Sequence, residues 1–350
     1  MREINSIEIK HDAHIGTARR AVHEFASRAD FSETELAEID IVVQEIGTNA
    51  VRYATGGGWL HFALTLGEAR GLELFYWDAG PGIYNMDRAI RDGVSTSGSM
   101  GSGLGAIRRL MDEFDVYSTV RETKRLRSAA VAARRTSHGT AMLARKWVGG
   151  TKDKREQIAD AKRFGVWSRP HPKEEANGDA YFMRERGGRT LLAVIDGLGH
   201  GHGAKEAADV ALEVLGDWMG EPLEELFQTI HNALRATRGA VMAAVIIDDE
   251  PSRIQYAGVG NIEVRVINAP EPVTTIPVHG TLGARFNQVR VWTHEWSRDA
   301  LIVMASDGLS ARWDMDSYPG LPARSPQLIA GILMRDYSRA ADDATVLVAR

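Results

Sequence analysis

Residues 45–54 of this 350-residue chain read EIGTNAVRYA, and they lie within one predicted helix. Ser32 and Glu35 have the spacing of a capping box, and apolar residues recur at helical spacing from Leu36 onward. We therefore expect a helix over residues 33–54, ended by the glycines at 56–58. Glu45 and Asn49 are four residues apart and so share one face. A carboxylate and a carboxamide held together could serve as a general base and a Mg²⁺ ligand.

The next motif, WDAGPG, covers residues 77–82 and follows two predicted strands, 59–66 and 72–77. An aspartate at the end of a strand, here Asp78, can accept a hydrogen bond from the exocyclic amine of a base. Gly80 and Gly82 let the backbone come close to a flat ligand, because they have no Cβ. This motif indicates a pocket for a planar nucleobase.

A third motif, GSGLG at residues 101–105, opens a predicted helix at 106–114. Backbone N–H groups at a helix N-terminus can cradle phosphates when no side chains obstruct them. Strands are expected at 116–119 and 140–147. No GxxxxGK[ST] motif is present, so a P-loop fold is disfavoured.

Together the three motifs resemble the GHKL ATPase family of histidine kinases, gyrase B, Hsp90 and MutL. Within it they are most similar to the RsbT-like switch serine/threonine kinases of bacterial partner switching. The resemblance covers residues 1–148 and implies a GHKL (Bergerat) α/β sandwich. It also implies that Glu45 activates a substrate hydroxyl or a water, that Asn49 holds the Mg²⁺ of ATP, and that Asp78 binds adenine. The glycines implied to shape the adenine pocket or wrap the phosphates, under a lid at 84–100, are Gly80, Gly82, Gly101, Gly103 and Gly105.

Carboxylates beside strand ends mark the second half of the chain. Asp179 precedes an aromatic strand, Asp196 and Asp307 each follow an apolar run, and Asp342 and Asp343 introduce the last strand. Hard oxygen ligands of this kind suit Mg²⁺ or Mn²⁺. Two such ions could activate water and bind a phosphoryl group. The pattern of clustered strands with helices between them is typical of an α+β fold.

The motifs GDAYF, DGLGHGHGAKEAA, AGVGNIEV, GTLG, SDGLS and DDATVLV occur here in that order. They resemble the PPM-type metal-dependent protein phosphatases of the SpoIIE/RsbX-like subgroup, over residues 162–350. The resemblance implies an αββα sandwich with a two-ion site of Mn²⁺ or Mg²⁺. The implied ligands, with Asp342 preferred to Asp343 and Gly197 acting through its carbonyl, are Asp179, Asp196, Gly197, Asp307 and Asp342.

Three other features have competing interpretations. His200 and His202 could suggest zinc, but they lie in a glycine-rich turn without cysteine partners, so turn geometry is favoured. The basic segment 121–135 could bind an acidic partner or nucleic acid, and a solvated loop is favoured. Residues 149–161 are polar and lack periodicity, so we expect a linker there that permits either independent domains or docking.

The composition excludes several classes of protein. The chain has no cysteine, which excludes disulfides, thiolate nucleophiles and iron–sulfur sites. The formal net charge of −5 is not that of a dedicated nucleic-acid binder. No apolar stretch approaches the ~20 residues of a membrane span, and the N-terminus lacks a signal-peptide core. We therefore expect a cytoplasmic protein that binds neither membrane nor nucleic acid.

The two halves predict a bifunctional switch enzyme. By family resemblance it phosphorylates and dephosphorylates Ser or Thr of a STAS-domain protein, an anti-sigma antagonist or stressosome component. A second hypothesis keeps only the phosphatase catalytic and makes the N-terminal half a nucleotide-gated binding module. A third makes the chain an anti-sigma factor that binds a sigma factor directly.

Overall fold

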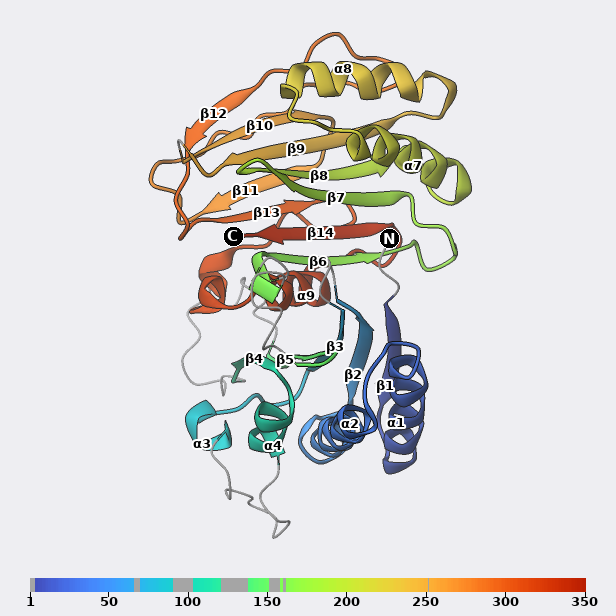
Figure 1. The fold of residues 1–350 in the computed structure, drawn as a ribbon, viewed down its shortest axis with the longest axis vertical. Helices are drawn as coiled ribbons and strands as arrows, with labels where there is room; N and C mark the ends of the chain where they lie inside the picture. Colours follow the sequence, from blue (N-terminus) through green and yellow to red (C-terminus); the bar gives the residue numbers. More distant parts are fainter. Residues whose placement is uncertain are drawn as a thin grey trace, which may run out of the picture. The chain divides into compact units, whose positions relative to one another are not determined.

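The computed structural model describes residues 4–65, 70–90, 103–120, 138–150, 158–159, 162–250 and 252–350. The chain forms two compact units (Figure 1). The C-terminal unit comprises residues 164–314 and 329–350, and the N-terminal unit comprises the residues before 164 together with 315–328. The predicted boundaries at 148 and 162 stay a prediction. No helix of the described residues is long and apolar enough to cross a membrane.

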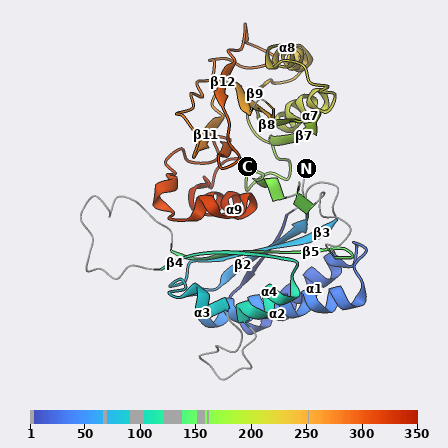
Figure 2. The same ribbon diagram turned by 60° about the vertical axis from the view of Figure 1, so that its left-hand side comes forward.

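The N-terminal unit is a five-stranded antiparallel sheet with helices on one face (Figure 2). The strand order is β1-β2-β3-β5-β4. Its elements are β1 (Asn5–Ile9), α1 (Asp12–Ala26), α2 (Glu33–Tyr53), β2 (Gly58–Leu64), β3 (Gly71–Asp78), α3 (Met86–Ile90), α4 (Gly103–Leu110), β4 (Glu113–Thr119) and β5 (Gly139–Trp147).

Helix α2 is the central element of this unit. The predicted capping box is confirmed: the N–H of Glu35 donates to the Ser32 hydroxyl at 3.3 Å, and the N–H of Ser32 donates to the Glu35 carboxylate at 2.8 Å. One face of α2 packs in a core with α1 and with the alternate residues of β2 and β3. The polar face carrying Glu45 and Asn49 is thereby held in a fixed direction.

The sequence-based boundaries were wrong for α4, expected at 106–114. The helix begins at Gly103 and ends at Leu110, and Phe114 belongs to β4, where it pairs with Ala144 of β5. The sheet therefore takes residues that local periodicity assigned to the helix. Strand β1 and helix α1 had no sequence-based expectation.

The C-terminal unit contains two antiparallel sheets, ordered β12-β10-β9-β8-β7 and β11-β13-β14-β6. Helices α7 and α8 pack on the first sheet (Figure 1). The elements are β6 (Phe164–Arg169), β7 (Asp179–Arg186), β8 (Arg189–Gly197), α7 (His202–Gly216), α8 (Leu223–Ala233), β9 (Ala240–Asp248), β10 (Arg253–Val259), β11 (Glu263–Ile267), β12 (Trp292–Glu295), β13 (Leu301–Ala305), α9 (Pro326–Tyr337) and β14 (Ala344–Ala349).

The most apolar strands form the middle of the first sheet. Strand β9 is buried throughout, and β8 is buried except at its first residue and at Asp196. The apolar run at residues 289–293 favours a strand there, but β12 starts only at Trp292, opposite Tyr256 of β10. Beyond Tyr256 the edge of β10 is occupied by Val278, whose N–H donates to Gly258 at 2.8 Å. No edge remains there for residues 289–291.

Candidate functional site

The three nucleotide-type motifs adjoin one another in the N-terminal unit. The turn after β3 lies against the end of α2, since a Cβ added to Gly80 would be 3.1 Å from the Cα of Ala54. Helix α4, which begins at Gly103 and contains Gly105, packs beside α2. Gly101, most of the expected lid at 84–100 and the basic segment 121–135 lie outside the described residues.

Asp78 is the buried anchor of this site, with an exposed fraction of 8%. One carboxylate oxygen, Oδ1, accepts the N–H of Gly80 at 2.7 Å and the N–H of Thr140 at 3.3 Å. These two bonds fix the carboxylate in place, beside the phenol of Tyr76. Burial and the charge of Asp78 raise the pKa of the Tyr76 phenol, so this neighbour stays neutral.

Glycines at close approaches shape the same pocket. Gly82 has a φ of +78°, and a Cβ there would lie 2.2 Å from the carbonyl oxygen of Thr119. Gly139 has a φ of +125°, and its Cβ would lie 2.0 Å from the carbonyl oxygen of Asp78. His138 contacts the Gly80 carbonyl through Nδ1 at 2.9 Å. Sequence reasoning missed His138 and Gly139, and the available signal was the Gly-Thr pair that starts β5.

Glu45 and Asn49 lie one turn apart in the last half of α2, and both are half-buried. The opposite side of this turn is closed, because a Cβ on Gly47 would come within 2.9 Å of Ile15. The pair therefore faces away from α1. A carboxylate and an amide oxygen in this position suit the roles of base and Mg²⁺ ligand.

The second site is a cluster of carboxylates at one end of the C-terminal sheets. Strand register places Asp179 of β7 directly opposite Asp196 of β8. The Ser306 hydroxyl donates to Asp179 at 2.6 Å, which brings the end of β13 to the same place. Asp307 follows Ser306 and accepts a hydrogen bond from the side-chain amide of Asn261 at 2.8 Å.

These carboxylates are close enough to oppose one another's ionisation. Burial, together with the charges of Asp343 and Asp307, raises the pKa of Asp179 to about 7, against the hydrogen bond from Ser306. Burial and the charges of Asp179 and Asp307 raise the pKa of Asp196 to about 8. The cluster therefore favours positive charge, in the form of protons or cations.

Asp342 and Asp343 have different surroundings. The Asp343 carboxylate is buried and accepts the N–H of His171 at 2.7 Å. Asp342 is half-buried, and its charge is a principal electrostatic cause, after burial, of the raised pKa of Asp307. The charge of Asp343 is likewise a cause of the raised pKa of Asp179, so the cluster adjoins Asp343 as well as the expected ligand Asp342. Its role stays a prediction.

The donor set fits a hard divalent cation, because it consists of carboxylates whose mutual repulsion a cation would relieve. Position 197 has no room for a side chain, since a Cβ there would lie 2.1 Å from the carbonyl oxygen of Ala204. Among the described residues, no three or more His, Asp or Glu side chains form a group that could hold a metal ion as they are placed in this structure. Asp179, Asp196, Asp307, Asp342 and the Gly197 carbonyl are the groups that would hold the ions.

The two histidines of the glycine turn do not converge. His200 pairs through Nδ1 with Glu174 at 2.9 Å and stacks on His171. His202 begins α7 after Gly201, whose φ is +74°. Glycine in this turn is required by the backbone, as the sequence indicated.

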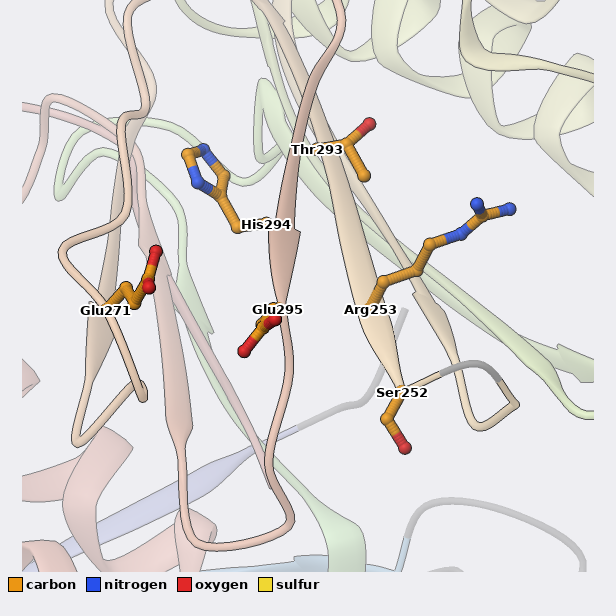
Figure 3. Close-up of a pocket in the computed structure, with 6 residues that line it drawn as sticks. All are labelled: Ser252, Arg253, Glu271, Thr293, His294 and Glu295. Carbon is orange, nitrogen blue, oxygen red and sulfur yellow. The ribbon is translucent and has the colours of Figure 1, made fainter.

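A separate polar pocket of about 290 Å³ lies at the β10–β12 edge (Figure 3). His294 and Glu271 lie on one side of β12, and Arg253 lies on the other (Figure 3). The Nε2 atom of His294 lies 3.2 Å from the backbone nitrogen and 3.1 Å from the carbonyl oxygen of Thr274, so the ring is tied to the neighbouring loop. None of the predicted site residues lines this pocket.

The two halves of the chain are similar to two different kinds of known protein. Residues 10–128 match the histidine kinase-like ATPase domain. The serine/threonine-protein kinase RsbT of Bacillus subtilis is 32% identical over 123 residues, which are 35% of this chain and 92% of RsbT. The phosphoserine phosphatase RsbX of the same organism is 25% identical over 135 residues, 38% of this chain and 67% of RsbX.

A solved structure from work on the bacterial stressosome, described as a modular system adapted to control secondary messenger signalling, is also similar. It aligns with a TM-score of 0.51 and 31% identity, and covers 54% of this chain and 98% of its own. The likeness to RsbT spans nearly all of that kinase, and the likeness to RsbX spans two thirds of that phosphatase. The chain therefore belongs to the RsbT-like branch of the histidine kinase-like ATPase family, and it fuses this kinase domain to an RsbX-like phosphatase domain.

Proposed function

We propose that this chain is a partner-switching regulator that both adds and removes phosphate on Ser or Thr of a STAS-domain protein, an anti-sigma antagonist or stressosome component. The observation that carries the proposal is the presence, in one chain, of the Asp78 pocket beside Glu45 and the carboxylate cluster around Asp196. We infer a GHKL (Bergerat) α/β sandwich for the first unit and an αββα sandwich for the second.

In the N-terminal unit, ATP and Mg²⁺ are the proposed cofactors. Asp78 accepts the adenine amine, while Gly80 and Gly82 admit the ring. Gly101, Gly103 and Gly105 leave backbone N–H groups open to the phosphates. Asn49 holds Mg²⁺, and Glu45 takes the proton from the hydroxyl of the substrate.

In the C-terminal unit, Asp179, Asp196, Asp307, Asp342 and the Gly197 carbonyl hold two ions, Mn²⁺ or Mg²⁺. Such ions supply Lewis acidity toward the phosphoryl group and lower the pKa of water. The protein fixes the carboxylates: the Ser306 hydroxyl holds Asp179, and the Asn261 amide holds Asp307. No side chain forms a covalent intermediate in this proposal.

The test follows labelled phosphate from ATP onto a STAS-domain protein over time, with Mg²⁺ and Mn²⁺ present. We expect Asp196→Ala to accumulate phosphorylated partner, because removal of phosphate is lost, and Glu45→Ala to accumulate none. Gln44→Ala and Asp217→Ala are matched controls, since both side chains are exposed neighbours outside the two sites. Both controls are expected to behave as the wild-type protein does.

One result would favour the alternative function. If neither the wild-type protein nor Asp196→Ala labels the partner, while added phosphorylated partner is hydrolysed, the chain is a phosphatase only. The N-terminal unit would then be a nucleotide-gated module that binds the partner or a sigma factor.

A further inference from the structure

Arg238 lies at the same end of the first C-terminal sheet as the carboxylate cluster. Strand register pairs Gly197 of β8 with Ala240 of β9. The alignment continues one step beyond the strands, where the N–H of Leu198 donates to the carbonyl of Gly239 at 3.0 Å. Arg238 therefore follows opposite Gly199, three residues along the chain from Asp196.

The side chain of Arg238 lies across the glycine turn that leads from Asp196 into α7. A Cβ added to Gly203 would be 2.5 Å from Nε and 2.6 Å from Cζ of Arg238. A Cβ added to Gly199 would be 3.4 Å from Nη1. The guanidinium thus rests on the backbone of this turn, and glycine at 203 leaves the room for it.

The side chain of Arg238 is exposed. It makes no ion pair or hydrogen bond with the described residues. Two other cations in this region, Arg169 and Lys205, are engaged. Arg169 donates to the carbonyls of Pro170 and Asp342 at 3.2 and 3.1 Å. Lys205 is paired with Asp209 at 2.6 Å. Arg238 is a cation that remains available to a ligand.

A phosphomonoester dianion needs such a cation here. Two divalent ions neutralise the four carboxylates, so a further positive charge beside the ions strengthens the binding of a dianion. Arginine binds phosphate oxygens through two parallel N–H groups, so it fixes orientation as well as charge. We propose that Arg238 binds the phosphoryl group of the phosphorylated protein substrate and positions it over Asp196; this rests on the proposed phosphatase function.

The kinetic test compares Arg238→Gln, which keeps most of the side-chain packing, with the wild-type enzyme on a phosphoserine peptide in Mn²⁺. We expect KM to rise about 10-fold or more, the usual effect of losing a charged hydrogen bond, with kcat within about 3-fold. Arg238→Lys is expected to recover part of the loss. The Mn²⁺ concentration for half-maximal activity should not change, because Arg238 binds no ion.

A second readout does not need turnover. Fluorescence anisotropy would follow binding of a peptide carrying a non-hydrolysable phosphonate in place of phosphoserine, and Arg238→Gln should weaken it by a similar factor. Arg235→Gln is the matched control, an exposed arginine one turn earlier, expected to bind as the wild type does. Unchanged phosphonate binding by Arg238→Gln, or equal weakening by Arg235→Gln, overturns the proposal. A wild-type protein that binds phosphonate through Arg238 but hydrolyses no phosphopeptide instead refutes the phosphatase function alone.

Discussion

At the scale of single residues, Asp196 shows a conflict between stability and the proposed function. Its carboxylate is largely buried near those of Asp179 and Asp307, and these surroundings raise its pKa to about 8. Asn needs no proton and adds no charge beside these carboxylates, so the replacement removes the cost of burying Asp196 among them. Without divalent ions, we expect Asp196→Asn to be more stable than the wild type by ~1–2 kcal/mol.

The measurement for Asp196→Asn is thermal unfolding in a chelator and then in Mn²⁺. The wild type should gain stability when Mn²⁺ is added, and the variant should gain much less. Asp217→Asn serves as the control, because Asp217 is exposed at the end of α7. An equal response of wild type and Asp196→Asn to Mn²⁺ would show that Asp196 holds no ion.

His61 in β2 gives the protein a pH-dependent stability. The Nε1–H of Trp77 donates to its Nε2 at 2.8 Å, so this nitrogen must be unprotonated, and burial lowers the pKa of the ring to about 4. The unfolded chain has the ordinary value of about 6.5 and binds the proton first as the pH falls. We therefore expect the free energy of unfolding to decrease from pH 6.5 down to about 4, by at most ~3 kcal/mol.

Denaturant unfolding at a series of pH values would measure this effect. Other groups also titrate in this range, so the comparison is with His61→Gln, which keeps an acceptor but does not titrate. The variant should lose less stability between pH 6.5 and 4 than the wild type does. Parallel curves for the two proteins would exclude His61 as the source.

At the scale of secondary-structure elements, the N-terminus of α2 depends on its capping box. Ser32→Ala removes the acceptor for the Glu35 N–H and should cost ~1 kcal/mol of stability. Ser27→Ala is the control, because that hydroxyl donates only to an exposed carbonyl at the end of α1. Urea unfolding of both variants would measure the difference, and equal midpoints would contradict the role of the cap.

Two glycines test the backbone of the N-terminal unit in opposite directions. Gly139→Ala at the start of β5 places a methyl group against the Asp78 carbonyl at a positive φ, so we expect lost stability and lost ATP binding. Gly16→Ala, within α1, meets only ordinary contacts and should stabilise the helix by ~0.5–1 kcal/mol. Calorimetry and nucleotide titration distinguish the two; retained ATP binding in Gly139→Ala would contradict the pocket.

The sequence predicted elements well where one segment carries its own signals. Helix α2 has its cap and its apolar stripe, and β9 has an unbroken apolar run, so both were found within two residues. The end of α4 was missed because the residues after it pair with β5. The start of β12 was missed because Val278 occupies the edge of β10 beside which residues 289–291 would have paired. Such boundaries depend on residues that are distant in the sequence, and local hydrophobic periodicity carries no information about them.

The candidate sites follow the same rule. Motif order located Asp78 and the acidic residues, but the contact of His138 and Gly139 with the Asp78 turn joins positions about 60 residues apart. Arg238 carries no motif of its own. It reaches the glycine turn only through the register of β8 and β9.

At the scale of the whole molecule, each unit has its own apolar core, one around α2 and the other around α7, α8 and β9. We expect ATP with Mg²⁺ to stabilise the first unit and Mn²⁺ the second, each by ~2.7 kcal/mol at 100 times its Kd. Calorimetry with each ligand should shift a different transition. A single transition moved by both ligands would contradict independent units.

The alignment of β7 with β8 has a consequence for how the chain matures. The two-residue turn Gly187–Gly188, with φ of +57° and +73°, sets this alignment, and a slip of one residue would turn Asp179 to the other face. Only one alignment brings Asp179 and Asp196 together. If these residues bind ions as proposed, the ions stabilise only chains in which the hairpin has this alignment.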